Sequence, residues 1–130
     1  MAKIRRKGVA LVESSKGVLV VAGRSKKFTL PGGGANAGES RQSAAIRELY
    51  EETGLKSLTA KYLLSYTGST WKKHNGTLVK NHAKVFVIKA QGVPHPRHEI
   101  RYIAWVPPKS AIRLSERTKS ILKNYWKIKE

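Results

Sequence analysis

A glycine-rich turn followed by a glutamate-rich stretch is the feature that most limits the fold of this chain. Pro31 and the three glycines after it end a short apolar segment at residues 28–30. From Glu39 to Glu52 the sequence contains neither Gly nor Pro, and Gly54 follows as a left-handed stop. This pattern predicts a helix over residues 39–52 that is entered directly from a tight turn.

The charge of this stretch is opposite to that of the rest of the chain. The protein has 26 Lys and Arg against 8 acidic residues, all of them Glu, and a net charge of +18. Residues 33–55 carry four Glu and two Arg, a net −2, so the remainder carries +20. The basic remainder predicts attraction to polyanions. The absence of Cys excludes disulfides, thiolate metal sites and a Cys nucleophile.

Three glutamates of the predicted helix share one face. Glu48, Glu51 and Glu52 stand at positions i, i+3 and i+4. Three like charges destabilise an isolated helix, and a divalent cation would offset their repulsion. Oxygen ligands without His or Cys suit Mg²⁺ or Mn²⁺. Arg47, four residues before Glu51, is positioned to orient that carboxylate, whereas the competing interpretation is a solvated charged helix face.

The remaining elements are predicted from apolar runs and turn formers. Strands are expected at residues 9–12, 18–22, 58–66, 85–88 and 102–106, a loop or a long hairpin tip at 68–81, and a last helix capped by Ser115. At 130 residues, the chain is expected to form a single domain over 1–130. No apolar stretch approaches the ~18 residues of a membrane span. The apolar run after the basic N-terminus is too short for a signal peptide, so a cytoplasmic protein is expected.

The segment 33–55, which contains the glycine turn and the predicted helix, resembles the Nudix box, Gly-x5-Glu-x7-Arg-Glu-apolar-x-Glu-Glu-x-Gly-apolar. Every defined position matches: Gly33, Glu39, Arg47, Glu48, Leu49, Glu51, Glu52, Gly54 and Leu55. The order of the predicted elements is also similar to that of the Nudix fold. The resemblance implies an α+β fold, a Nudix-like α/β/α sandwich with a mixed β-sheet between helices.

The resemblance also implies an activity and a set of roles. The activity is metal-dependent hydrolysis, with Mg²⁺ or Mn²⁺, of a diphosphate linked to another moiety, usually a nucleoside. The metal ligands carried over by position are Glu48, Glu51, Glu52 and the carbonyl of Gly32. Arg47 orients a ligand carboxylate, and Glu39 either supports the junction of turn and helix or is a further ligand. Gly33 and Gly54 are structural.

The group that takes a proton from the attacking water has two candidates. Glu48 is on the helix, whereas family members often place a Glu before the strand that ends in an aromatic residue, which here is Glu99. The competing interpretation of Glu99 is a surface acid paired with a neighbouring Arg.

Substrate contacts are predicted on both sides of the box. Relatives use basic residues before the glycine turn to bind phosphate, which here are Arg24, Lys26 and Lys27, although solvated charges would give the same pattern. Phe28 and Trp71 are candidates for stacking on a base. His82 and Lys84 lie in a stretch, residues 81–86, that resembles the diphosphoinositol polyphosphate phosphohydrolases.

These features leave two classes of function open. The first is a pyrophosphohydrolase whose partner is a small anionic polyphosphate, with nucleoside triphosphates or dinucleoside polyphosphates favoured. The second is a protein that binds RNA, or processes RNA 5′ ends, on a Nudix scaffold. Many relatives are dimers, so a homodimer is a further expected partner, and a membrane is not.

Overall fold

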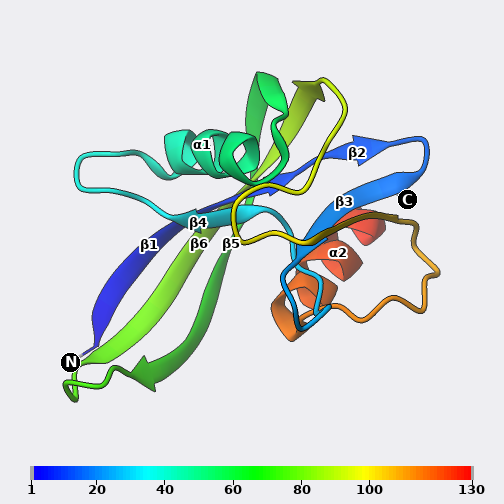
Figure 1. Cartoon of the computed structure of the whole chain (residues 1–130). Helices are drawn as coiled ribbons and strands as arrows, with labels where there is room; N and C mark the ends of the chain where they lie inside the picture. The colour runs from blue at the N-terminus through cyan, green and yellow to red at the C-terminus, as the bar shows by residue number, and fades with distance from the viewer. Residues whose placement is uncertain (1, 130) are drawn as a thin grey trace.

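The computed structural model describes residues 2–129 and contains two helices and seven strands in that range (Figure 1). In chain order the elements are β1 (Lys3–Leu11), β2 (Glu13–Ser14), β3 (Gly17–Ala22), β4 (Gly32–Gly34), α1 (Arg41–Thr53), β5 (Lys56–Lys72), β6 (Leu78–Gln91), β7 (Tyr102–Val106) and α2 (Glu116–Lys129). The described helices, of 13 and 14 residues, are both too short to cross a membrane.

The strands form one mixed sheet and one antiparallel sheet. The four-stranded sheet has the order β4-β1-β6-β5, in which β1 and β6 are parallel and the other pairs are antiparallel. The three-stranded sheet has the order β2-β3-β7. The predicted mixed sheet is therefore confirmed, although neither the basic strand start at residues 3–8 nor the glycine strand β4 was anticipated.

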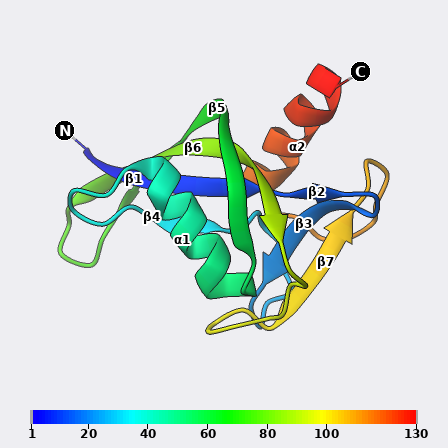
Figure 2. The same ribbon diagram turned by 90° about the horizontal axis from the view of Figure 1, so that it is seen from above.

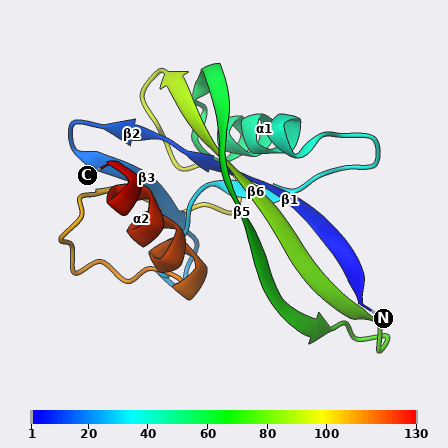
Figure 3. The ribbon, with the colours of Figure 1, turned by 180° about the vertical axis from the view of Figure 1, so that it is seen from behind.

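Alternation along β1 and β3 explains why both faces of the sheets are buried. In β1, Val9 and Leu11 join the core cluster that contains Ile121 and Leu122 of α2. Ala10, between them, joins the other cluster with Leu49 of α1. Since successive strand residues point to opposite faces, α1 and α2 cover opposite sides of the sheets, as Figures 1 and 3 show.

Helix α1 begins and ends close to the predicted positions, and its caps explain why. The Ser43 amide donates to the Ser40 hydroxyl at 3.0 Å, which caps the N-terminus. Gly54 adopts φ +80° and its amide donates to the Tyr50 carbonyl, which ends the helix. The helix lies close on β1 because Gly8 has no side chain there: a Cβ would lie 1.9 Å from the Arg41 carbonyl oxygen.

The segment 68–81 is not a long loop. Strands β5 and β6 run through most of it and pair as far as Lys72 and Leu78, so the hairpin alternative is correct and only a short turn remains. In that turn the Lys73 amide donates to Thr77 and Gly76 has φ +84°. The polar composition reflects a hairpin whose outer part is mostly exposed, rather than irregular structure.

Candidate active site

Glu52 is a buried acid near the C-terminal end of α1. Its side chain is 6% exposed, and one carboxylate oxygen accepts a hydrogen bond from the Gly32 amide at 3.2 Å. Burial raises the pKa of Glu52 to about 8, the Gly32 bond opposes this shift, and the negative charges of Glu48 and Glu99 add to it. Without a cation, this carboxyl is therefore held largely protonated at neutral pH.

Arg47 ties the other acids of the motif into one network. Its guanidinium donates to both oxygens of Glu39, at 2.9 and 3.0 Å. It also donates to Glu48 at 2.8 Å and to Glu51 at 3.2 Å. A further bond of 3.0 Å reaches the Gly34 carbonyl and fastens the glycine turn to the helix. The planar fork of Arg is suited to such multiple contacts, and the predicted contact with Glu51 is confirmed.

Glu39 closes this network at the start of the helix. Its carboxylate also accepts the Asn36 amide at 2.9 Å, which fixes the turn before α1. The bonds from Arg47 and Asn36 lower the pKa of Glu39 to about 2. Of the two roles predicted for Glu39, this geometry corresponds to support of the turn–helix junction.

Gly33 leaves room for the Glu48 carboxylate. A Cβ on Gly33 would lie 2.6 Å from the Glu48 carboxyl carbon, closer than side chains tolerate. The strand β4 therefore passes directly beside this acid. Gly33 and Gly32 together bring bare backbone to two carboxylates of α1, and the predicted structural position of Gly33 has a steric explanation.

Glu99 lies in the connection of residues 92–101, which passes the C-terminal end of α1 (Figure 2). The Arg97 amide donates to the Glu52 carbonyl and the His95 amide to the Thr53 carbonyl, so this segment is held against the helix. Glu99 is exposed and its charge acts on Glu52. It is not paired with an Arg, because no ion pair within residues 2–129 includes it.

The carboxylates of Glu48, Glu51 and Glu52 are oxygen donors that suit a hard divalent cation, but in this structure they do not converge on one point. In the part of the chain that the structure describes, no group of three acidic or His side chains is close enough to hold a metal ion. The hydrogen bonds explain this spread, because Arg47 holds Glu48 and Glu51 while the Gly32 amide holds Glu52. All these donors are oxygens, as Mg²⁺ and Mn²⁺ prefer.

Two basic residues that sequence reasoning missed line a small cavity together with Glu52. Lys7 of β1 and Arg117 of α2 line this cavity of about 100 Å³ together with Glu52, Gly32 and Ile100. Strand periodicity could have indicated Lys7, because it is two residues before the core residue Val9. Nothing local in the sequence indicates Arg117, which reaches the cavity only through the packing of α2.

The basic residues predicted before the glycine turn are exposed in the connection after β3. Arg24, Lys26 and Lys27 have no ion pair within the described range. The Lys26 ammonium lies 5.3 Å from the centre of the Tyr102 ring on β7. No contact joins these three residues to the glutamates of α1, so their role in phosphate binding stays a prediction.

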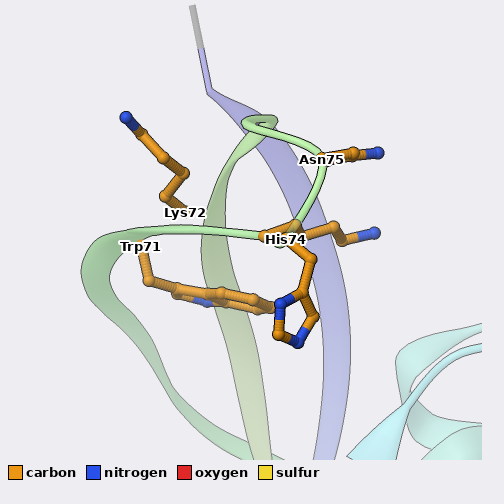
Figure 4. A pocket seen from close by; sticks show the side chains of 5 residues that line it. Trp71, Lys72, His74 and Asn75 are labelled. Atoms are coloured by element: carbon orange, nitrogen blue, oxygen red, sulfur yellow. The ribbon is translucent and has the colours of Figure 1, made fainter.

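The predicted aromatic residues lie in two other places. Phe28 packs against the core cluster of α2. Trp71 is next to the last residue of β5, near the tip of the β5–β6 hairpin. Figures 1 and 3 show this tip beside the start of β1 and away from α1. Figure 4 shows Trp71 and His74 on one side of the turn, with Lys72 pointing away. Neither aromatic ring is brought to the glutamates.

His82 and Lys84 lie on β6, on the side of the sheet that faces α1. The His82 ring nitrogen Nδ1 is 3.0 Å from the guanidinium of Arg41, the first residue of α1. Since Arg41 is 11 residues before Glu52, the two sites are about 16 Å apart along the helix. Lys84 lies over the Tyr62 ring at 5.8 Å. The structure therefore places both residues outside the glutamate cluster.

Comparison with solved structures gives the same fold over the whole chain. A protein from Chromobacterium violaceum assigned to the nudix hydrolase family is 35% identical, with a TM-score of 0.81, over 100% of this chain and 81% of that one. A MutT NUDIX hydrolase from Burkholderia pseudomallei is 21% identical, with a TM-score of 0.74, over 93% and 97%. The second likeness shows the fold alone.

Two further matches concern other activities. A bifunctional NMN adenylyltransferase/ADP ribose pyrophosphatase from Francisella tularensis, solved with AMP and a Mn ion, is 20% identical, with a TM-score of 0.68, over 98% of this chain and 42% of that one. The RNA pyrophosphohydrolase of Brucella anthropi is 51% identical over 37 residues, which span 28% of this chain and only 21% of that protein.

A family model of the NUDIX domain matches residues 3–125. This range contains the glycine turn, the glutamate helix with its Arg47 network, and the connection that carries Glu99. The match agrees with the motif, with the mixed sheet and with the solved relatives. The chain therefore belongs to the NUDIX domain family, the family of the Nudix hydrolases.

Proposed function

We propose that this Nudix hydrolase cleaves a diphosphate bond in a nucleoside polyphosphate or a related polyphosphate, with Mg²⁺ or Mn²⁺ held by Glu48, Glu51, Glu52 and the Gly32 carbonyl. The observation that carries the proposal is the buried carboxyl of Glu52, on which the negative charges of Glu48, Glu99 and Glu51 act. Ionising a buried carboxyl beside other acids is costly, and a bound divalent ion would offset this cost.

Nudix hydrolases generally use divalent metal ions, and the oxygen donors of this chain suit such an ion. When bound, a divalent ion neutralises phosphate oxygens and favours attack by water in line with the leaving group. Arg47 supports the site by holding Glu48 and Glu51 on the same guanidinium. The Gly32 amide positions Glu52 by its hydrogen bond.

The proton of the attacking water is assigned to Glu99 rather than Glu48. The Glu48 carboxylate already accepts a hydrogen bond from Arg47 at 2.8 Å, which occupies one of its lone pairs, and in this proposal it is also a metal ligand. Glu99 is exposed, and no hydrogen bond from any residue in 2–129 is directed to its side chain. A carboxylate on a surface connection can reach the water and then release the proton to solvent.

The proposal is tested by a hydrolysis screen of the purified chain with Mg²⁺, with Mn²⁺ and with EDTA. The panel contains nucleoside triphosphates, dinucleoside polyphosphates, nucleotide sugars, inositol pyrophosphates and 5′-triphosphorylated RNA. We expect phosphate-containing products from at least one class, only in the presence of metal. If every substrate stays intact with both metals, the proposed activity is wrong for this chain.

A second candidate is cleavage at the 5′ end of RNA. The 51% identity to part of an RNA pyrophosphohydrolase and the net charge of +18 favour it. An RNA substrate would bind partly through its phosphate backbone, so its KM would increase steeply with salt. A small polyphosphate has fewer contacts and a shallower salt dependence, which separates the two candidates in the same screen.

A further inference from the structure

Arg5 and Lys7 present two cations on the side of the sheet that faces α2. They precede Val9 of the α2 core cluster at steps of two, so the alternation of β1 gives them the same face. The guanidinium of Arg5 lies over β4, since a Cβ on Gly34 would be 3.2 Å from Arg5 Nη2. Both side chains thus lie next to the glycine turn that borders Glu52.

Arg117 brings a third cation to this place from the other end of the sequence. It lies in the first turn of α2, and its guanidinium is 5.7 Å from the centre of the Tyr66 ring on β5. It lines the same cavity as Lys7 and Glu52. The three cations Arg5, Lys7 and Arg117, here called the basic cradle, therefore lie beside the candidate active site.

The basic cradle forms no ion pair with any described residue, although Glu52 lines the same cavity. Within residues 2–129, no ion pair or side-chain hydrogen bond includes Arg5, Lys7 or Arg117. Burial and the charges of Arg117 and Arg5 lower the pKa of Lys7 to about 8, and the negative charges of Glu52 and Glu48 offset only part of this shift. Like charges gathered in a partly buried place destabilise the free protein and stabilise a bound anion.

Asn81 adds a polar group without a partner to the same place. It lies opposite Arg5 in the register of β1 and β6. Its side-chain oxygen is buried and accepts no hydrogen bond from any described residue. A Cβ on Gly68 would be 3.7 Å from Asn81 and 3.9 Å from Arg117, so Asn81 and Arg117 border the same point of β5. A hydroxyl group of a ligand would satisfy this oxygen.

We propose that the basic cradle binds a phosphate of the substrate beyond the diphosphate that is cleaved, and that Asn81 accepts a hydrogen bond from a hydroxyl of the same moiety. The substrate class is then a polyphosphate with charge on both sides of the cleaved bond, attached to a sugar or another polyol. A substrate whose second moiety is neutral would leave three cations uncompensated. This inference rests on the proposed function, because the cradle is placed relative to Glu52.

Binding without turnover tests the cradle directly. Inorganic tripolyphosphate is titrated calorimetrically, in EDTA, into the wild type and into Lys7→Gln, Arg117→Gln and Lys7→Arg. Lys123→Gln is the matched control, because it removes one exposed cation from α2 outside the cradle. We expect each Gln variant to bind about tenfold more weakly, whereas Lys7→Arg and the control stay near the wild type.

Turnover then tests the link to the active site. KM is measured for diadenosine tetraphosphate, which has additional phosphates, and for ADP-ribose, which has none. The increase in KM from the wild type to each Gln variant should be about tenfold larger for diadenosine tetraphosphate than for ADP-ribose. Equal tripolyphosphate affinity in Lys7→Gln, Arg117→Gln and the control would overturn the cradle, even if hydrolysis is normal. If the chain hydrolyses nothing, the proposed function fails while the calorimetry still decides whether the cradle exists.

A thermal melt excludes a loss of folding as the cause of weaker binding. Removing one of three like charges should leave Tm unchanged or raise it. Tripolyphosphate should raise Tm of the wild type more than that of either Gln variant, because a ligand stabilises only the state that binds it. The same increase of Tm in all variants would also overturn the cradle.

Discussion

Glu39 and Glu52 lie at opposite ends of the same turn and helix, and their surroundings differ in almost every respect. Glu39 receives both arms of the Arg47 fork and a backbone amide, and the pKa of its carboxyl is lowered to about 2. Glu52 is buried beside other acids, receives one backbone amide, and has its pKa raised to about 8. Glu39 is thus compensated by the protein itself, whereas Glu52 is compensated only when a cation or a proton is added.

This difference separates structure from chemistry within one motif. Arg47 and Glu39 hold the glycine turn against the start of the helix, and their hydrogen bonds need no added ligand. The Glu52 side stores unfavourable electrostatics that a metal ion would relieve.

The largest effect is expected from Glu52→Gln. The amide keeps the size of the side chain and can still accept the Gly32 bond, but it is a poor ligand for a divalent ion. Hydrolysis with metal should decrease by about 10³-fold or more, measured as kcat/KM on the best substrate of the screen. Glu116→Gln, an exposed acid of α2, is the control and should keep wild-type activity. Retained turnover in Glu52→Gln would remove Glu52 from the metal site.

Glu99→Gln should have the next largest effect. If Glu99 takes the proton, kcat should decrease by about 10²-fold, while binding of metal, followed by calorimetry with Mn²⁺, should stay near that of the wild type. Fast turnover in Glu99→Gln together with a slow Glu48→Gln that still binds metal would assign the base to Glu48 instead.

Arg47→Lys tests the hydrogen-bond network in which Arg47 compensates the charge of Glu39. Lysine keeps the charge but cannot donate to three carboxylates and a carbonyl at once. We expect the free energy of unfolding to decrease by about 1–3 kcal/mol and kcat/KM to decrease by about 10-fold. Urea denaturation and steady-state kinetics measure the two effects. Arg113→Lys, at an exposed position, is the control, and identical behaviour of the two variants would contradict the network.

Metal-free stability should depend on pH through Glu52. Between its ordinary pKa of about 4.5 and the folded value of about 8, the folded state keeps a proton that the unfolded state has lost. The free energy of unfolding in EDTA should therefore fall as pH increases from 5 to 8. The difference between the wild type and Glu52→Gln isolates this contribution, and a difference that does not vary with pH would contradict the burial of an acid.

The smallest effect concerns Glu39 and has the opposite sign. Since its folded pKa is about 2, its contribution to stability is present above pH 4.5 and is lost as pH falls through 2. Glu39→Gln should lower Tm by a few degrees at pH 7, and the difference from the wild type should shrink towards pH 2. A constant difference over this range would show that the ionised form of Glu39 is not the stabilising one.

The sequence was informative wherever one short segment decides the geometry. The i, i+3 and i+4 spacing of Glu48, Glu51 and Glu52, the stop at Gly54 and the contact between Arg47 and Glu51 all follow from helix geometry, and all are present. The sequence indicated only that the backbone at Gly33 approaches another group closely. That this group is the Glu48 carboxylate follows from the packing of β4 against α1, which the sequence does not show.

The sequence was less informative where distant segments meet. Lys7 and Arg117 are brought to one cavity by strand β1 and by the docking of α2, which no local pattern encodes. Polar residues in an exposed hairpin resemble a loop, which hid the full length of β5 and β6. Trp71 and His82 were grouped with the site by composition and resemblance, whereas strand length and the bond to Arg41 place them elsewhere.

The parallel pairing of β1 with β6 has a consequence for how the protein folds. Its register joins Lys3 to Val79 and Leu11 to Val87, so β1 cannot pair with β6 until residues 79–87 have been synthesised. Contacts of such long sequence separation slow folding. The β5–β6 hairpin and α1 can form early from local contacts. The addition of β1, which carries Lys7 and pairs with the glycine strand, is then expected to be the late step that completes the catalytic centre.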